Sequence, residues 1–318
     1  MILALLTLGG LAGLLVGGEL IVRGAVATAL RLGLSPLLVG LTIVALGTSA
    51  PEIVTSVQAA LAGAPSLAVG NILGSNIANV LLVLGLCALV RPLLIANAGF
   101  RRDAWAVVGA TALGTAVLAI GFVDRAVGIA LLAILLGYLG YAYWSEKHGK
   151  SSATAQQMIE ESTSEGDEKR PGIWRALAMT LGGLIGILVG AHLLVEGAVG
   201  IARLAGLSEA TIGATIVAIG TSLPEMVASV MAALRGQSGV AIGNIMGSNL
   251  FNILGVLAAT AIAVPFAVPP EVLNIDIWVM LLATLVLWFI ATRRPVMTRI
   301  EGGVLFLCYL GYLFLLLG

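Results

Sequence analysis

The feature that most limits what this chain can fold into is a segment that occurs twice. The first copy covers residues 40–85 and contains GTSAPE at 47–52 and GNILGSNIAN at 70–79. The second covers residues 213–258 and contains GTSLPE and GNIMGSNLFN at the matching positions. The copies align at a constant offset of 173 residues without a gap, and 28 of the 46 aligned positions are identical. Such self-similarity indicates a chain built from two related halves.

The composition places both halves in a membrane. The chain is 59% hydrophobic and 10% charged, whereas a soluble domain has about a quarter of charged residues. The apolar runs are long enough to cross about 30 Å of hydrocarbon as helices. The first run lacks the basic start and the cleavage site of a signal peptide, so we expect it to be the first span. A net charge of zero gives no indication of nucleic-acid binding.

The hydropathy pattern predicts an all-α integral membrane protein with ten transmembrane helices. The predicted spans are residues 2–30, 36–62, 66–90, 103–122, 126–144, 174–204, 209–234, 239–264, 273–291 and 301–317. With the N-terminus outside, 13 of the 16 lysines and arginines fall in inner loops and at inner span ends. This bias predicts both termini outside, a cytoplasmic linker, and a place in the cell inner (plasma) membrane.

The number of spans between the copies then fixes their relative direction. Five spans separate Glu52 from Glu225, an odd number, so the copies enter the membrane in opposite directions. We therefore expect two inverted five-helix repeats, residues 1–145 and 173–318, joined by a linker at 146–172. Secondary transporters with this plan bind their substrate near the midplane, where the repeats meet.

Each copy carries a glutamate inside an apolar segment. Thr48, Ser49 and Glu52 share one helix face, and Thr221, Ser222 and Glu225 share the equivalent face. A carboxylate at this depth costs about 2.5–3.5 kcal/mol on insertion scales, so two mirrored ones indicate a bound positive charge. Pro51 and Pro224 interrupt both helices and free backbone carbonyls. Such breaks are tolerated where the freed carbonyls are buried or line a cavity.

The following span in each half adds a polar stripe. Its members recur at four-residue steps: Asn71, Ser75 and Asn79 in the first half, and Asn244, Ser248 and Asn252 in the second. We expect helices 2, 3, 7 and 8 to be broken around a central ion site. Polar side chains in membranes also serve only to bond neighbouring helices, but mirrored carboxylates beside prolines favour an ion site.

The chemistry of these residues selects the ion. All the candidate ligands are oxygens, which favour hard cations over soft metals. Calcium takes six to eight oxygens. Two glutamates that each bind through both oxygens, together with two backbone carbonyls, supply about six. Cys87 and Cys308 lack metal-ligand spacing, so we predict that both are packing residues without a disulfide.

These motifs resemble the α-repeats of the sodium/calcium exchanger family, in the calcium:cation antiporter superfamily. The paired GTSxPE and GNxxGSNxxN segments carry the resemblance, which covers the whole chain. It implies a secondary active antiporter, not an enzyme, that exchanges three sodium ions for one calcium ion by alternating access. It also implies that the first and sixth spans slide against the rest. The expected partners are Ca2+, Na+ and the lipid bilayer, with no cofactor; the oligomeric state is left open, a monomer included.

The resemblance assigns roles by position. It implies that Glu52 and Glu225 bind calcium with the backbone carbonyls of Thr48 and Thr221. It implies one sodium site lined by Ala45, Ser49 and Ser75, its mirror lined by Ala218, Ser222 and Ser248, and Asn79 and Asn252 flanking the centre. Some members, including those that co-transport potassium, carry aspartate at the position matching Asn252.

Three other functions remain open. Proton-coupled calcium exchangers of the same superfamily resemble a GNxxE pattern, whereas Gly74 and Gly247 stand at that position here. A cation channel would need the same oxygens but no inverted symmetry. An intramembrane hydrolase would need a nucleophile and base or a metal-binding pair, and the sequence has no HExxH motif.

Several charged residues lie outside the repeated segments. Glu19 and Arg23 are four residues apart, as are His192 and Glu196, and we predict helix-face or cavity-lining pairs. The linker carries Glu160, Glu161, Glu165, Asp167 and Glu168. Because these lack the alternating spacing of a calcium loop, we interpret the linker as a solvated connection rather than a regulatory calcium site.

Overall fold

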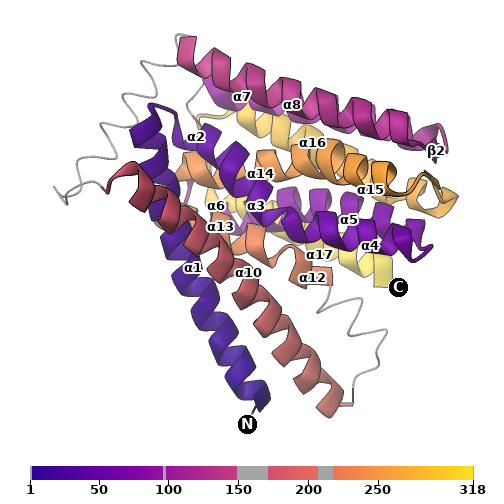
Figure 1. Ribbon diagram of the computed structural model, residues 1–318, viewed down its shortest axis with the longest axis horizontal. Coiled ribbons are helices and arrows are strands. Elements are labelled where there is room, and N and C mark those ends of the chain that lie inside the picture. The colour runs from indigo at the N-terminus through magenta and orange to yellow at the C-terminus, as the bar shows by residue number, and fades with distance from the viewer. Residues whose placement is uncertain (1, 96–97, 149–170, 207–217, 318) are drawn as a thin grey trace.

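The computed structural model describes residues 2–95, 98–148, 171–206 and 218–317, which form a helical bundle (Figure 1). The predicted linker site at 160–168 and the start of the seventh predicted span lie outside these residues. The helices of the first half are α1 Ile2–Leu32, α2 Pro36–Val39, η1 Gly40–Val44, α3 Ala45–Thr48, α4 Ala50–Leu61, α5 Pro65–Ala78, η2 Asn79–Leu84, α6 Gly85–Val90, α7 Ala98–Ala119 and α8 Arg125–His148.

The second half repeats the same order. Its helices are α10 Ile173–Leu204, α12 Ala218–Thr221, α13 Leu223–Leu234, α14 Ser238–Leu250, η4 Phe251–Val256, α15 Leu257–Ala263, η5 Pro270–Leu273, α16 Asp276–Arg293 and α17 Arg299–Leu317. Within the described ranges, seven helical segments are long and apolar enough to span a membrane, and the bent pair α2–α4 makes an eighth. The helix α7 falls short of that measure because Arg102 and Asp103 lie near its start.

Two short antiparallel strand pairs join the halves. Strand β1, Leu93–Leu94, pairs with β4, Val296–Met297, and β2, Phe122–Val123, pairs with β3, Phe266–Ala267. Strands β1 and β3 are 173 residues apart and β2 and β4 are 174 residues apart, so each pair joins equivalent parts of the two halves. The halves also meet at equivalent threonines, because Thr111 Oγ1 of α7 lies 3.4 Å from Thr284 Oγ1 of α16.

The predicted helix breaks are confirmed. Ser49, between α3 and α4, leaves the helical conformation (φ −84°, ψ 5°), and the helix bends by 41° there. Ser222 has nearly the same torsions, φ −87° and ψ 3°. The third and eighth predicted spans are interrupted differently, by the π-helical segments η2, which begins at Asn79, and η4, which begins at Phe251 beside Asn252. Such π segments occur often at functional sites.

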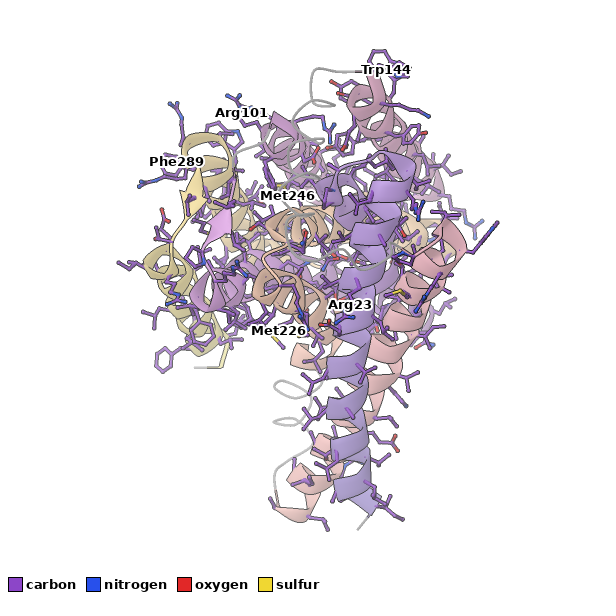
Figure 2. The ribbon with its side chains drawn as sticks, turned by 90° about the vertical axis from the view of Figure 1, so that its left-hand side faces the viewer. Arg23, Arg101, Trp144, Met226, Met246 and Phe289 are labelled. Atoms are coloured by element: carbon purple, nitrogen blue, oxygen red, sulfur yellow. The ribbon has the colours of Figure 1, made fainter. Side chains whose placement is uncertain are left out.

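The interrupted helices occupy the interior. Every residue of α14 is buried, and Met246 of α14 lies inside the bundle in Figure 2, whereas Phe289 and Trp144 lie at its periphery. The outer helices expose large apolar side chains, among them Trp105, Ile129 and Trp278. An apolar exterior is what a helical bundle presents to lipid.

The helices α1 and α10 lie side by side and project from the bundle (Figures 1 and 2). Glycines make this pairing close: a Cβ on Gly17 would lie 2.6 Å from the amide nitrogen of Ile187, and one on Gly183 would clash with that of Ile21. Only glycine permits such an approach, as in other close membrane-helix pairs. The α1–α10 pair is therefore one packed unit.

The expectations for the cysteines are met only in part. Both cysteines are free and Cys87 is buried, but Cys308 is exposed, so the prediction that Cys308 is a packing residue is wrong. Glu19 pairs with Arg23, and His192 with Glu196, along their own helices.

Candidate functional site

The two carboxylates occupy equivalent places directly after the helix breaks. Glu52 lies in the first turn of α4 and Glu225 in the first turn of α13, and each side chain is 1% exposed. The exposed N–H groups of a first helical turn favour a negative charge there. In both glutamates, Oε2 is buried without a hydrogen-bond partner among the described residues.

A serine in one break reaches the carboxylate after the other. Ser49 Oγ donates to Glu225 Oε1 at 3.0 Å, although 176 residues separate them. This contact brings the two copies of the repeated segment together at a single place. The site therefore belongs to both halves, as an inverted repeat predicts.

Thr48, the last residue of α3, lies against the second-half stripe on α14. Its Oγ1 lies 3.2 Å from Asn244 Oδ1 and 3.5 Å from Ser248 Oγ. It also donates to the carbonyl of Ala45 at 3.3 Å. The side chain of Thr48 thus connects the end of α3 to α14 of the other half.

The first asparagine of each stripe donates hydrogen bonds to the helix that follows each break. Asn71 Nδ2 donates to Ser56 Oγ at 2.9 Å and to the backbone carbonyl of Glu52 at 3.5 Å. Asn244 Nδ2 donates to Ser229 Oγ at 2.9 Å and to the carbonyl of Glu225 at 3.3 Å. These two asparagines position the first turns that carry the glutamates, which is the helix-bonding role.

The last asparagines of the stripes differ. Asn79 Nδ2 donates to Asn249 Oδ1 at 3.1 Å, and Asn79 Oδ1 has no partner among the described residues. Both amide atoms of Asn252 are buried without a partner there as well. Buried polar atoms are nearly always hydrogen-bonded. Four acceptor oxygens, Oε2 of both glutamates and Oδ1 of both asparagines, are therefore available to a cation.

The other predicted site residues lie around these oxygens. Ala45, Ser75, Ser222 and Ser248 are buried, and Thr221 ends α12. Ala218 begins α12, and its side chain lies outside the described residues. No cluster of three or more histidine, cysteine, aspartate or glutamate side chains occurs in the ranges that the structure covers. Any bound cation would therefore be held mainly by two carboxylates and neutral oxygens.

Asn249 was not singled out in the sequence, although it contacts Asn79. The repeat could have identified it, because Asn76 and Asn249 stand at the same position of the two repeated segments. Asn76 Nδ2 donates within its own helix to the carbonyl of Ile72 at 2.7 Å. Equivalent residues therefore make different contacts in the two halves.

Comparison with known proteins agrees with this geometry. The family model for the sodium/calcium exchanger protein matches residues 2–144 and 175–318. Sodium/calcium exchanger MaX1 of Methanosarcina acetivorans is 31% identical, over 98% of this chain and 97% of that one. Inner membrane protein YrbG of Escherichia coli is 35% identical, over 75% and 73%. A structure of the sodium-calcium exchanger NCX_Mj, soaked with zero Na+ and Ca2+, superposes with a TM-score of 0.84 at 31% identity, over 99% of both chains.

The helical bundle, its apolar exterior and these comparisons define a multi-pass membrane antiporter of cations. More narrowly, the chain belongs to the sodium/calcium exchanger protein family.

Proposed function

We propose that this protein exchanges sodium for calcium across a membrane. The observation that carries the proposal is a set of four buried acceptor oxygens, on Glu52, Glu225, Asn79 and Asn252, that receive no hydrogen bond from any residue the structure describes. Two formal charges match one divalent ion, and oxygen ligands suit calcium. The names of MaX1 and NCX_Mj, which cover nearly the full chain, support the same pair of ions.

The proposed ligands are those that the family resemblance implies. Calcium is held by Glu52 and Glu225 with the backbone carbonyls of Thr48 and Thr221. One sodium site is lined by Ala45, Ser49 and Ser75, and its mirror by Ala218, Ser222 and Ser248. The burial of Ala45, Ser49, Ser75, Ser222 and Ser248 supports these sites. Asn79 and Asn252 offer their free amide oxygens at the centre.

The proposed cycle is alternating access with three sodium ions exchanged for one calcium ion. The repeats, residues 1–145 and 173–318, form the two halves, and ten spans place both termini outside and the linker, 146–172, in the cytoplasm of the cell inner (plasma) membrane. Movement of the α1–α10 pair against the bundle changes access. The pair's close internal packing supports its motion as one unit.

Liposomes that contain only this protein test the proposal. An outward sodium gradient should drive uptake of calcium-45, and dissipating that gradient should stop it. Uptake that follows a proton gradient and ignores sodium would assign the protein to proton-coupled exchange instead. Calcium entry that needs no counter-ion would contradict antiport altogether.

A further inference from the structure

An ion pair between described residues links the α1–α10 unit to the bundle. Glu19 Oε2 on α1 lies 2.7 Å from Arg235 Nη2 and 2.8 Å from its Nε, so the guanidinium binds this oxygen through two nitrogens. Arg235 is the C-cap of α13, the helix that carries Glu225. The other Glu19 oxygen binds Arg23, one turn further along α1. Glu19 thus connects α1 to α13, the helix that carries the proposed calcium ligand Glu225.

The bundle side of this contact is anchored. Arg91, directly after α6, donates through Nη1 to the carbonyl of Leu234 at 3.2 Å. Arg235 is the next residue, so its backbone is tied to α6. The ion pair with Glu19 is therefore made to a position that is fixed in the bundle, not to a free helix end.

The α1 side is seated closely. Next to Glu19, a Cβ on Gly18 would lie 2.7 Å from Met231 Cγ and 3.1 Å from Val227 Cγ1. Both neighbours belong to α13. The ion pair therefore accompanies direct packing of α1 on α13.

The mirror positions lack both features. The 173-residue offset maps Glu19 onto His192 and Arg235 onto Ala62, and an alanine cannot form an ion pair. The side chain of His192 is 78% exposed, and its ion pair is with Glu196 of the same helix. Val54 of α4, the equivalent of Val227, is 54% exposed. In this structure α1 is seated on α13, whereas α10 leaves the equivalent face of α4 open.

We propose that the Glu19–Arg235 pair is a latch that holds the α1–α10 unit on α13 and favours this one access state. The inference rests on the proposed alternating access. In an inverted repeat, the second state exchanges the arrangements of the two halves. There α10 would be seated on α4, and α1 would leave α13. The ion pair breaks on that step, and the pair His192 and Ala62 forms no replacement. The latch therefore gives two nearly symmetric states unequal populations.

The distance between the mirror positions 62 and 192 reports the state directly. Spin labels attached there, through the substitutions Ala62→Cys and His192→Cys in a Cys308→Ser background, would be read by pulsed electron resonance in lipid bilayers. The protein with an intact latch should give mainly the long distance. Glu19→Gln and Arg235→Gln should each raise the population of the short distance roughly twofold to fivefold, the range for a partly exposed ion pair.

Two comparisons separate the latch from its surroundings. The double variant Glu19→Gln with Arg235→Gln should shift the population no further than either single variant, because both remove the same contact. Arg23→Gln removes only the partner on α1 itself and should leave the distances unchanged. Equal shifts for Arg23→Gln and Arg235→Gln, or additive shifts in the double variant, would overturn the latch.

The same distance measurement also distinguishes a failure of the latch proposal from a failure of the proposed alternating access. A short-distance population that responds to sodium and calcium but not to Glu19→Gln overturns the latch and leaves alternating access intact. A single distance under every ion condition contradicts alternating access, and the latch with it.

Discussion

Ser49 donates a hydrogen bond to Glu225 at 3.0 Å, so a residue in the helix break of one half directly contacts the carboxylate of the other. Both groups are buried. Each half supplies one glutamate to the proposed site, so neither half alone would provide two charges for a divalent ion. Under the proposed function, contact across the halves is a condition for calcium binding.

The first prediction concerns the carboxylates. Glu52→Gln and Glu225→Gln keep the side-chain shape and remove one charge each, so each should lower sodium-driven calcium uptake at least about thirtyfold, as for the loss of a buried charge partner. Initial calcium-45 uptake into liposomes measures this. Glu196→Gln, at a side chain that is 57% exposed, is the matched control and should transport normally. Near-normal uptake by Glu225→Gln would contradict its place in the site.

The second prediction tests the contact between the halves. Ser49→Ala removes a hydrogen bond to a charged group, worth about 1.5–3 kcal/mol, and should raise the calcium concentration for half-maximal exchange by at least about tenfold. Ser49→Thr keeps the hydroxyl and should lose less. Equal affinities for the alanine and threonine variants would show that the hydroxyl does not orient Glu225.

The third prediction concerns the α1–α10 pair. Gly183→Ala places a Cβ against the backbone nitrogen of Ile21 on α1, whereas a Cβ on neighbouring Gly182 meets no atom within 4 Å. Forcing an atom into a packed contact typically costs about 1–3 kcal/mol. Thermal unfolding in detergent should therefore be at a lower temperature for Gly183→Ala and unchanged for Gly182→Ala. Equal melting temperatures would show that the pair is loosely packed.

The repeated segment made much of the site predictable. It placed Glu52 and Glu225 in equivalent environments, and Pro51 and Pro224 indicated the breaks that Ser49 and Ser222 now occupy. These features are local: a proline beside a glutamate acts on its own helix. The sequence therefore located the two buried carboxylates and the interruptions without any knowledge of how the halves pack.

Contacts between distant residues were not predictable in this way. Nothing in the sequence pairs Asn79 with Asn249 rather than with its own equivalent Asn252, because helix rotation and register decide that choice. The same holds for two partly buried tyrosine–aspartate hydrogen bonds: Tyr138 donates to Asp103 at 2.6 Å, and Tyr312 donates to Asp276 at 2.8 Å. The aspartates are 173 residues apart but the tyrosines 174, so a search at constant offset misses the relation.

The fourth prediction concerns membrane potential. Exchange of three sodium ions for one calcium ion moves one net charge in each cycle. A potential of 100 mV should therefore change the driving force by about 2.3 kcal/mol. This corresponds to about fiftyfold in the equilibrium ratio of calcium concentrations inside and outside the liposome. Clamping the liposome potential with potassium and valinomycin measures it. A calcium ratio that does not respond to potential would indicate electroneutral exchange.

The last prediction rests on Asn252, at whose position the family resemblance implies an aspartate in members that co-transport potassium. An amide offers one neutral oxygen and no charge, so the centre holds two carboxylates, and an additional monovalent ion beside calcium would lack a balancing charge. Glu19 cannot supply that charge, because Arg23 and Arg235 already bind both of its oxygens. We therefore expect sodium-driven calcium uptake to proceed at the same initial rate in potassium-free and in potassium-loaded liposomes. Asn252→Asp, which adds the third carboxylate, is the informative comparison. A strict potassium requirement in the unmodified protein would mean that the charge at the centre is not limited to Glu52 and Glu225.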